Sequence, residues 1–250
     1  MRQPLPHDTI TPLHDSTRPK KQQVADMFDR IAKRYDLMNR FLSARIDLYW
    51  RKKAIAQLKQ SAPKKLLDVA TGTADLSLLA YRMLKPDQII GIDISEGMLQ
   101  IGREKIRQRQ LDEQIRLLYG DAETINAPDR SFDAVMVAFG VRNFENLQAG
   151  LSEMLRVLKP GGQLVVVEFA TPRNGFFRRL YNGYMKDWAP RLAQQLNTDG
   201  QAYAYLNRSS NAFPDREAFV ALLQEAGYSK ASFTPLTFGI CCLYTATRPY

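Results

Sequence analysis

The chain has 250 residues, of which 45% are hydrophobic and 24% are charged, and its formal net charge is +9. These proportions are ordinary for a soluble globular protein and argue against a wholly disordered chain or a fibrous repeat. The longest apolar stretches fall far short of the roughly 20 residues that a membrane-spanning helix needs, which argues against a multipass membrane protein. One large α/β domain with a sizeable core fits this length.

The positive charge is concentrated near the N-terminus. Residues 1–65 contain 15 Lys and Arg against 6 Asp and Glu, whereas the remaining 185 residues contain 20 of each kind. A basic segment on a neutral body suggests contact with an anionic surface, either nucleic acid or the anionic face of a bilayer. The alternative is a solvated helical face that binds nothing.

Two features bear on the cellular setting. Cys241 and Cys242 are adjacent in a predicted strand, so their side chains should point to opposite faces, which excludes an ordinary disulfide framework. The first residues carry no apolar stretch of the kind found in a secretory signal. We therefore expect a reducing, cytoplasmic setting.

The first sixty residues predict a tail followed by helices. Residues 1–19 contain four prolines and little apolar periodicity, which predicts a flexible tail. From residue 20 to residue 42, apolar side chains recur every three or four positions, the spacing of a helix with one apolar face. A break near Ser43 then separates a second helix that runs to about residue 58. These helices should cover a single domain that occupies residues 20–250.

After Pro63 the apolar pattern changes to strands that alternate with helices. The predicted strands are residues 65–70, 88–93, 114–119, 132–138, 163–169, 229–236 and 238–246, and the predicted helices are residues 75–84, 96–109, 146–158 and 214–226. Such alternation predicts a doubly wound, mostly parallel α/β sheet. The aromatic and basic residues 172–213 interrupt the alternation, and we interpret them as a lid-like insertion over the top of the sheet.

Polar residues follow three of the predicted strands. Gly72 lies between the first strand and its helix, where the absence of a Cβ lets a ligand approach the backbone. Asp93 ends the second strand, 21 residues later, where a carboxylate can accept both hydroxyls of a ribose. Asp121 follows the third strand and can accept from an adenine amino group, while Ala122 offers its backbone amide. In an open α/β sheet, ligands bind outside the carboxyl ends of the strands.

The loop around Gly72 does not suit a pyrophosphate. A dinucleotide site needs three glycines there, but this chain has Ala70 and Ala74 on either side of Gly72, with Asp68 and Asp75 close by. Two carboxylates favour a cationic ligand, and S-adenosylmethionine, a nucleoside with a sulfonium and an amino-acid tail but no phosphate, matches. The alternative is a doubly wound domain with incidental acids at its strand ends.

Three further segments carry a specific resemblance. They are residues 35–39 (YDLMN) with Ser43 and Trp50, residues 139–143 (FGVRN), and residues 156–162 (RVLKPGG) with Glu168. With the loop described above, they make the chain similar to the ubiquinone/menaquinone biosynthesis C-methyltransferase family over nearly all of residues 20–250. Four positions depart from the family pattern, where a histidine, a glycine, a polar residue and a serine are replaced by Asp47, Ala74, Ala138 and Ala170.

The resemblance implies a fold, a cofactor and a reaction. It implies the seven-stranded fold of class I S-adenosylmethionine-dependent methyltransferases, with Thr73, Asp93, Asp121 and Ala122 in contact with S-adenosylmethionine. It also implies methylation of a ring carbon of a prenylated quinol. We favour demethylmenaquinol as that substrate. The benzoquinol intermediate of ubiquinone biosynthesis, or another phenolic or lipid-like acceptor, stays open.

Carbon is a poor nucleophile, so the site must align the ring with the methyl group and hold the developing phenolate. We expect Arg142, at the rim of the site, to supply a permanent cation, and Asn143 to orient an oxygen. Tyr35, with Asp36, is expected to close the site from the N-terminal helix. The simpler alternatives are a surface ion pair for Arg142 and core packing for Tyr35.

Other functions and partners receive less support. No metal-ligand pattern, nucleotide-binding lysine loop or RNA-recognition motif is present, so we expect neither a metal nor a nucleic-acid partner. An RNA methyltransferase and a nicotinamide-dependent oxidoreductase stay as weaker alternatives, and association into a homo-oligomer stays open. A prenyl tail lies in the bilayer, so we expect peripheral membrane contact through residues 20–42 and 173–191. The expected contact residues are Phe176, Phe177, Tyr184 and Trp188, with Arg173, Arg178 and Arg179.

Overall fold

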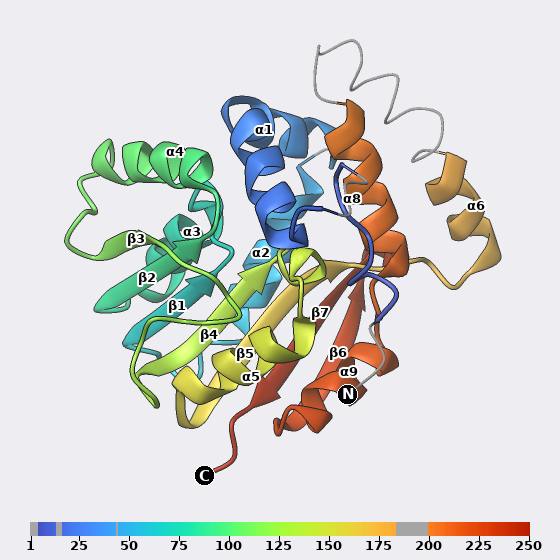
Figure 1. Ribbon diagram of the computed structural model, residues 1–250. Helices are drawn as coiled ribbons and strands as arrows, with labels where there is room; N and C mark the ends of the chain where they lie inside the picture. The colour runs from blue at the N-terminus through green and yellow to red at the C-terminus, as the bar shows by residue number, and fades with distance from the viewer. Residues whose placement is uncertain (1–4, 14–16, 44, 184–199) are drawn as a thin grey trace.

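The computed structural model describes residues 5–13, 17–43, 45–183 and 200–250. A seven-stranded sheet with the order β3-β2-β1-β4-β5-β7-β6 runs through the middle of the molecule (Figure 1). Its strands are β1 (Lys65–Val69), β2 (Gln88–Asp93), β3 (Ile115–Tyr119), β4 (Phe132–Ala138), β5 (Leu158–Phe169), β6 (Ser229–Leu236) and β7 (Cys241–Thr247). The first five strands pair in parallel, and β7 runs antiparallel to both β5 and β6. The predicted doubly wound, mostly parallel sheet is confirmed.

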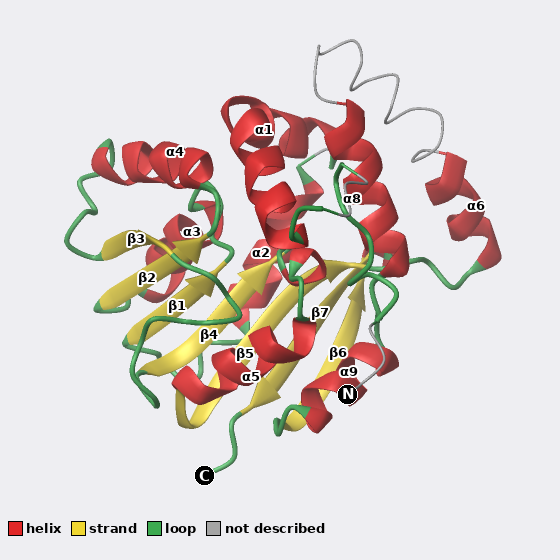
Figure 2. Ribbon diagram, in the orientation of Figure 1, coloured by secondary structure: helices red, strands yellow, loops and turns green. Residues whose placement is uncertain are grey.

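Helices lie on both faces of the sheet and across one of its ends (Figure 2). They are α1 (Lys20–Leu42), α2 (Ile46–Ala56), α3 (Asp75–Leu84), α4 (Glu96–Arg107), α5 (Leu147–Val157), α6 (Gly175–Gly183), α8 (Gly200–Ala212) and α9 (Glu217–Glu225), with 3-10 turns η1 (Val141–Asn143) and η3 (Thr237–Gly239). Helices α5 and α9 pack on one face, and α2, α3 and α4 pack on the other.

The strands alternate between two hydrophobic cores, because successive strand side chains point to opposite faces. In β5, Val166 belongs to the core under α5 and α9, whereas Val165 belongs to the core under α2, α3 and α4. In β7, Cys242 and Cys241 divide in the same way, and both thiols are buried and free. The sequence-based prediction that these two cysteines face opposite sides of the sheet is therefore confirmed.

Helix α1 covers the carboxyl ends of the parallel strands. Its apolar stripe, which includes Val24, Met27 and Ile31, forms a third core with Met98 of α4 and Tyr205 of α8. Figure 1 shows α1 between α4 and α8, above the ends of β1 and β4. The helix predicted for residues 20–42 is confirmed, and its packing closes the end of the sheet at which ligands of such folds bind.

The described part of the predicted flexible tail packs against the body, which corrects the expectation for residues 5–13. His7 is fully buried, its ring lies edge-on to Phe213 with centroids 5.7 Å apart, and its carbonyl accepts a hydrogen bond from the Lys20 Nζ at 2.7 Å. Leu5 packs against the core under α5 and α9. Sequence periodicity misses such docking because it depends on side chains far away in the sequence.

Of the element boundaries that differ from the predictions, two have a clear structural cause. Helix α9 begins at Glu217 and not at Pro214, because Arg216 has a non-helical backbone and its guanidinium binds the carbonyls of Thr171 and Gly239. Strand β5 begins at Leu158 and not at residue 163, because residues 158–162 also belong to the strand, with Gly161 at φ 74° donating its N–H to the Arg248 carbonyl. Residues 172–213 form α6 and α8 where described, and their role as a lid stays a prediction.

Candidate functional site

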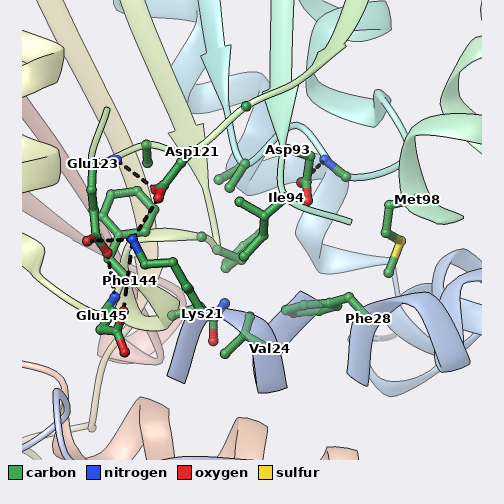
Figure 3. A pocket seen from close by; sticks show the side chains of 18 of the residues that line it. Lys21, Val24, Phe28, Asp93, Ile94, Met98, Asp121, Glu123, Phe144 and Glu145 are labelled. Carbon is green, nitrogen blue, oxygen red and sulfur yellow. Dashed lines mark hydrogen bonds and ion pairs between the residues drawn. The ribbon is translucent and has the colours of Figure 1, made fainter. Parts of the chain in front are cut away.

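A pocket lies between α1 and the carboxyl ends of β1, β2, β3 and β4 (Figure 3). The space among its lining residues, open solvent included, is about 670 Å³. The predicted site residues that line it are Tyr35, Gly72, Asp93, Asp121, Ala122 and Asn143. The structure thus brings together six of the eight site residues that the sequence suggested. Thr73 and Arg142 lie outside the lining.

Asp93 anchors the pocket at the end of β2. One carboxylate oxygen accepts the N–H of Gly72 at 2.8 Å, and the other accepts the N–H of Ser95 at 2.9 Å. Each oxygen has two acceptor sites, so both keep capacity for a ligand. Burial raises the pKa of Asp93 to about 6 even though backbone N–H groups bind its anionic form. Ser95 also caps α4 by accepting the Met98 N–H at 3.2 Å.

Gly72 presents open backbone to the pocket. Its φ is 56°, and a Cβ at this position would meet no atom within 4 Å. A positive φ favours glycine, and the open space beside it is where a ligand can approach the backbone. The loop conformation agrees with the role that the sequence suggested.

Asp121 and Lys21 form an ion pair on the other side of the pocket. The Lys21 Nζ reaches from α1 and lies 2.7 Å from the Asp121 Oδ2 and 3.2 Å from the Glu123 Oε2 (Figure 3). The other Asp121 oxygen accepts the N–H of Glu123 at 2.9 Å. Sequence reasoning missed Lys21, because a lysine beside another lysine at the start of an amphipathic helix resembles an ordinary surface residue.

Thr73 holds the loop and does not face the pocket. It is 2% exposed, and its hydroxyl donates to Asp36 at 2.6 Å and accepts from the Lys105 Nζ at 2.9 Å. Asp36 also pairs with Lys105 at 2.5 Å, so its carboxylate ties α1 to the loop and to α4. Asp36 therefore does not close the site beside Tyr35, as the sequence suggested. Its carboxylate instead fastens α1, the helix that carries Tyr35.

The two acids that flank the loop are already bound by protein groups, contrary to the expectation that both face a cationic ligand. Asp75 pairs with Lys105 at 2.8 Å and Arg40 at 2.7 Å; burial alone would raise its pKa, but these cations lower it. Asp68 accepts from the hydroxyls of Thr71 and Ser77, and burial raises its pKa to about 6. Its Oδ1 has no hydrogen-bond partner among the described residues.

Tyr35 and Asn143, the two residues expected to contact the methyl acceptor, both line the pocket. The Tyr35 ring lies edge-on to Phe28 with centroids 5.8 Å apart, and burial raises the pKa of its hydroxyl, which keeps it a neutral hydrogen-bond donor. The Asn143 Oδ1 accepts from the Tyr205 hydroxyl at 3.1 Å. That bond holds the amide of Asn143 toward α8 and fixes its orientation.

Arg142 lies behind the pocket wall, which corrects its predicted place at the rim. It is 3% exposed, and its Nη1 lies 2.5 Å from the Glu168 Oε1 and 2.8 Å from the Phe139 carbonyl oxygen. Its guanidinium carbon is 5.2 Å from the centroid of the Phe169 ring. The pair with Glu168 is buried, so the alternative of a surface ion pair is also wrong.

Three aromatic rings continue the wall. The centroids of Trp50 and Phe139 are 6.0 Å apart, those of Trp50 and Phe169 are also 6.0 Å apart, and those of Phe139 and Phe169 are 4.7 Å apart. The Trp50 Nε1 donates to Thr237 of η3 at 2.8 Å. Of the three rings, Phe139 lines the pocket, so its ring can contact a planar ligand, and Trp50 and Phe169 pack around it.

The chain matches proteins of known name over nearly its whole length. The model of the ubiE/COQ5 methyltransferase family matches residues 16–248. The chain is 46% identical over 243 residues to the demethylmenaquinone methyltransferase of Bacteroides fragilis, covering 97% of this chain and 99% of that protein. It is 41% identical over 230 residues to the ubiquinone/menaquinone biosynthesis C-methyltransferase UbiE of Geobacter sulfurreducens, covering 92% of this chain and 90% of that protein.

Solved structures share the fold at low sequence identity. The possible histamine N-methyltransferase of Thermotoga maritima, an S-adenosylmethionine-dependent methyltransferase, superposes with a TM-score of 0.61 at 20% identity, covering 90% of this chain and 99% of that chain. The [4+2]-cyclase SpnF superposes with a TM-score of 0.62 at 20% identity, covering 92% of this chain and 97% of that chain. The predicted fold of class I S-adenosylmethionine-dependent methyltransferases is confirmed. In the described part of the chain, none of the helices has the length and hydrophobicity that a membrane span requires. Among the same residues, no group of His, Cys, Asp and Glu side chains is arranged to hold a metal ion.

Proposed function

Because the chain belongs to the ubiE/COQ5 methyltransferase family, we propose that it methylates a ring carbon of demethylmenaquinol with S-adenosylmethionine. The observation that carries this proposal is the 46% identity over 97% of the chain to a demethylmenaquinone methyltransferase. The pocket at the strand ends supports the proposal, because its position and its lining suit a nucleoside with a cationic tail.

The lining residues fit the cofactor. Asp93, with both oxygens still able to accept, takes the ribose hydroxyls, and Gly72 lets the nucleoside pass close to the backbone. Asp121 and the backbone amide of Ala122 take the adenine edge. The lining carries Asp93, Asp121, Glu123 and Glu145 against the single cation Lys21, an excess of negative charge that attracts a sulfonium and repels a pyrophosphate.

The acceptor side orients the quinol ring. When bound, the cofactor supplies an electrophilic methyl group. The ring of Phe139, which lines the pocket and is held by Phe169 and Trp50, offers an aromatic face on which a quinol can stack. Tyr35, held neutral, donates to a quinol oxygen, and Asn143 orients the same oxygen. Arg142 acts from behind, holding the Phe139 carbonyl and adding positive charge to the wall where the phenolate develops.

A benzoquinol is the second candidate acceptor. The relative in Geobacter sulfurreducens is named for both ubiquinone and menaquinone biosynthesis, so the family name alone does not choose between the rings. Purified protein should be incubated with S-adenosylmethionine and short-chain reduced naphthoquinol or benzoquinol, and the products measured by mass spectrometry. We expect methylated naphthoquinol as the main product. If the benzoquinol is methylated faster, the benzoquinol and not demethylmenaquinol is the substrate. If neither compound is methylated, the proposed reaction is rejected.

Contact with a membrane surface follows from the acceptor's prenyl tail. Phe176 and Phe238 are 73% and 67% exposed, and Phe177 stacks on Phe238 with centroids 4.1 Å apart. Arg178 and Arg179 are exposed beside them on α6. We define these five residues as the aromatic-basic patch. Rings that enter a headgroup region next to cations that meet lipid phosphates are typical of interfacial anchors.

The aromatic-basic patch differs in part from the expected membrane contact. Arg173 forms an ion pair with Glu217, so its charge is already matched by a protein carboxylate. Phe238 was not expected, because it lies in η3, about sixty residues after α6. Tyr184 and Trp188, which were expected to take part, lie outside the described residues.

A further inference from the structure

Arg51 is a buried cation that the proposed reaction has not yet used. Its side chain in α2 is 9% exposed, and its Nε has no hydrogen-bond partner among the described residues. The nearest carboxylate oxygen is the Asp47 Oδ2 at 3.7 Å, too far for a hydrogen bond, and the other Asp47 oxygen accepts from the Ser43 hydroxyl. Burying a charge without hydrogen bonds is costly, so such a group calls for a partner that the protein alone does not supply.

Arg51 lies next to the pocket, although it is not one of the residues that line it. Its guanidinium carbon is 5.3 Å from the centroid of the Phe139 ring, and Phe139 lines the pocket. Its charge also lowers the pKa values of Asp68 and Asp75, the two acids that bracket the Gly72 loop. The guanidinium is therefore close to the loop and to the pocket wall at once.

The other cations around the site already form ion pairs with carboxylates of the protein. Lys21 binds Asp121, Lys105 binds Asp36 and Asp75, and Arg142 binds Glu168, each at 2.8 Å or less. Arg40 is also bound to Asp75. Of these five cations in the described part of the chain, Arg51 alone has no carboxylate within hydrogen-bonding distance.

An amino-acid tail brings a carboxylate into this region. The nucleoside end of the cofactor occupies the Asp93 and Asp121 side of the pocket, so its methionine end extends toward the Gly72 loop and Phe139. There the carboxylate of the tail needs a cation. We propose that Arg51 binds the carboxylate of the methionine tail of S-adenosylmethionine.

The inference rests on the proposed cofactor and concerns one residue of this chain. A guanidinium presents parallel N–H donors that match a carboxylate, so the bound tail would satisfy the Nε that now lacks a partner. Asp47, four residues earlier in the chain, keeps Arg51 oriented without forming a hydrogen bond to it.

The experiment compares two ligands that differ in the tail. S-adenosylhomocysteine carries the carboxylate, whereas 5′-methylthioadenosine has the same nucleoside and no amino acid. Binding of both should be measured by calorimetry with the wild type, with Arg51→Met, and with Lys52→Met as a control, since Lys52 is the exposed cation next along the same helix. We expect Arg51→Met to lower the affinity for S-adenosylhomocysteine at least tenfold and to change that for methylthioadenosine less than twofold. Lys52→Met should change neither.

Three outcomes would overturn the inference. The first is an unchanged affinity of Arg51→Met for S-adenosylhomocysteine, and the second is an equal loss of affinity for both ligands. If the methionine variant does not fold, Arg51→Gln replaces it, and a retained affinity for S-adenosylhomocysteine would be the same contradiction. The third is a wild type that binds both ligands equally. A wild type that binds neither ligand would instead reject the proposed cofactor, and the role of Arg51 with it.

Discussion

Arg142 and Glu168 form an ion pair that is closed to solvent: the Nη1–Oε1 distance is 2.5 Å, and neither side chain is more than 4% exposed. Burial raises the pKa of Glu168, while Arg142 acts against that rise. Removing one partner of such a pair leaves a buried charge without compensation, which costs about 3–5 kcal/mol of stability. Any test of Arg142 in catalysis must separate this loss from a loss of chemistry.

The first prediction therefore uses a pair of variants. Arg142→Met should lower turnover at least about tenfold with little change in cofactor affinity, as expected of a group that stabilises developing charge. It should also lower the free energy of unfolding, increasingly so as pH rises and the unpaired Glu168 ionises. Adding Glu168→Gln should restore stability in urea denaturation without restoring turnover. Recovery of both properties in the double variant would show that Arg142 serves only the fold.

The second prediction concerns Asp93. Asp93→Asn removes a charged acceptor for the ribose hydroxyls, so the affinity for S-adenosylhomocysteine should fall by about 1.5–3 kcal/mol in calorimetry. Because the folded-state pKa is raised to about 6, ionised Asp93 lowers stability, and that cost grows as pH rises from about 4 through 6. The variant should therefore lose less stability than the wild type between pH 4 and pH 7. An unchanged dissociation constant would remove Asp93 from the cofactor site.

The third prediction tests the aromatic-basic patch. With anionic vesicles at low salt the wild type should co-sediment, and the variant with Arg178→Glu and Arg179→Glu should stay in the supernatant. High salt should release the wild type, because surface charges are screened. A variant with Arg82→Glu in α3 and Lys85→Glu directly after it, which changes as many exposed cations, is the matched control and should still pellet. If the two double variants co-sediment with the vesicles to the same extent, a membrane contact specific to α6 is contradicted.

The fourth prediction concerns the docked N-terminal segment. Burial lowers the pKa of His7 to about 3, with a further contribution from Lys20, against about 6.5 in an unfolded chain. A depressed histidine pKa stabilises the fold above pH 6.5, and this contribution is lost as pH falls from 6.5 toward 3. The free energy of unfolding of the wild type should thus drop between pH 7 and pH 4.5. His7→Phe should show a smaller drop, and an equal drop would mean that His7 is not buried in solution.

The sequence by itself determined the sheet, its helices and one side of the pocket. Period-two and period-3.6 patterns are local, and they located every strand of the observed sheet. Gly72, Asp93 and Asp121 were found because the carboxyl ends of parallel strands must meet at one edge, so residues that end successive strands become neighbours. Here local order and topology together were enough.

Only the tertiary structure decided which charges are buried and which groups they bind. Arg51 precedes Lys52 and Lys53 in the sequence, and nothing local separates the one buried cation from the two exposed ones. The partners of Lys21 and Arg142 lie 100 and 26 positions away, at Asp121 and Glu168. Burial and pairing depend on how α1 and α2 pack against the strand ends, and that packing depends on the shape of the assembled surface. No periodic pattern along the chain records that shape.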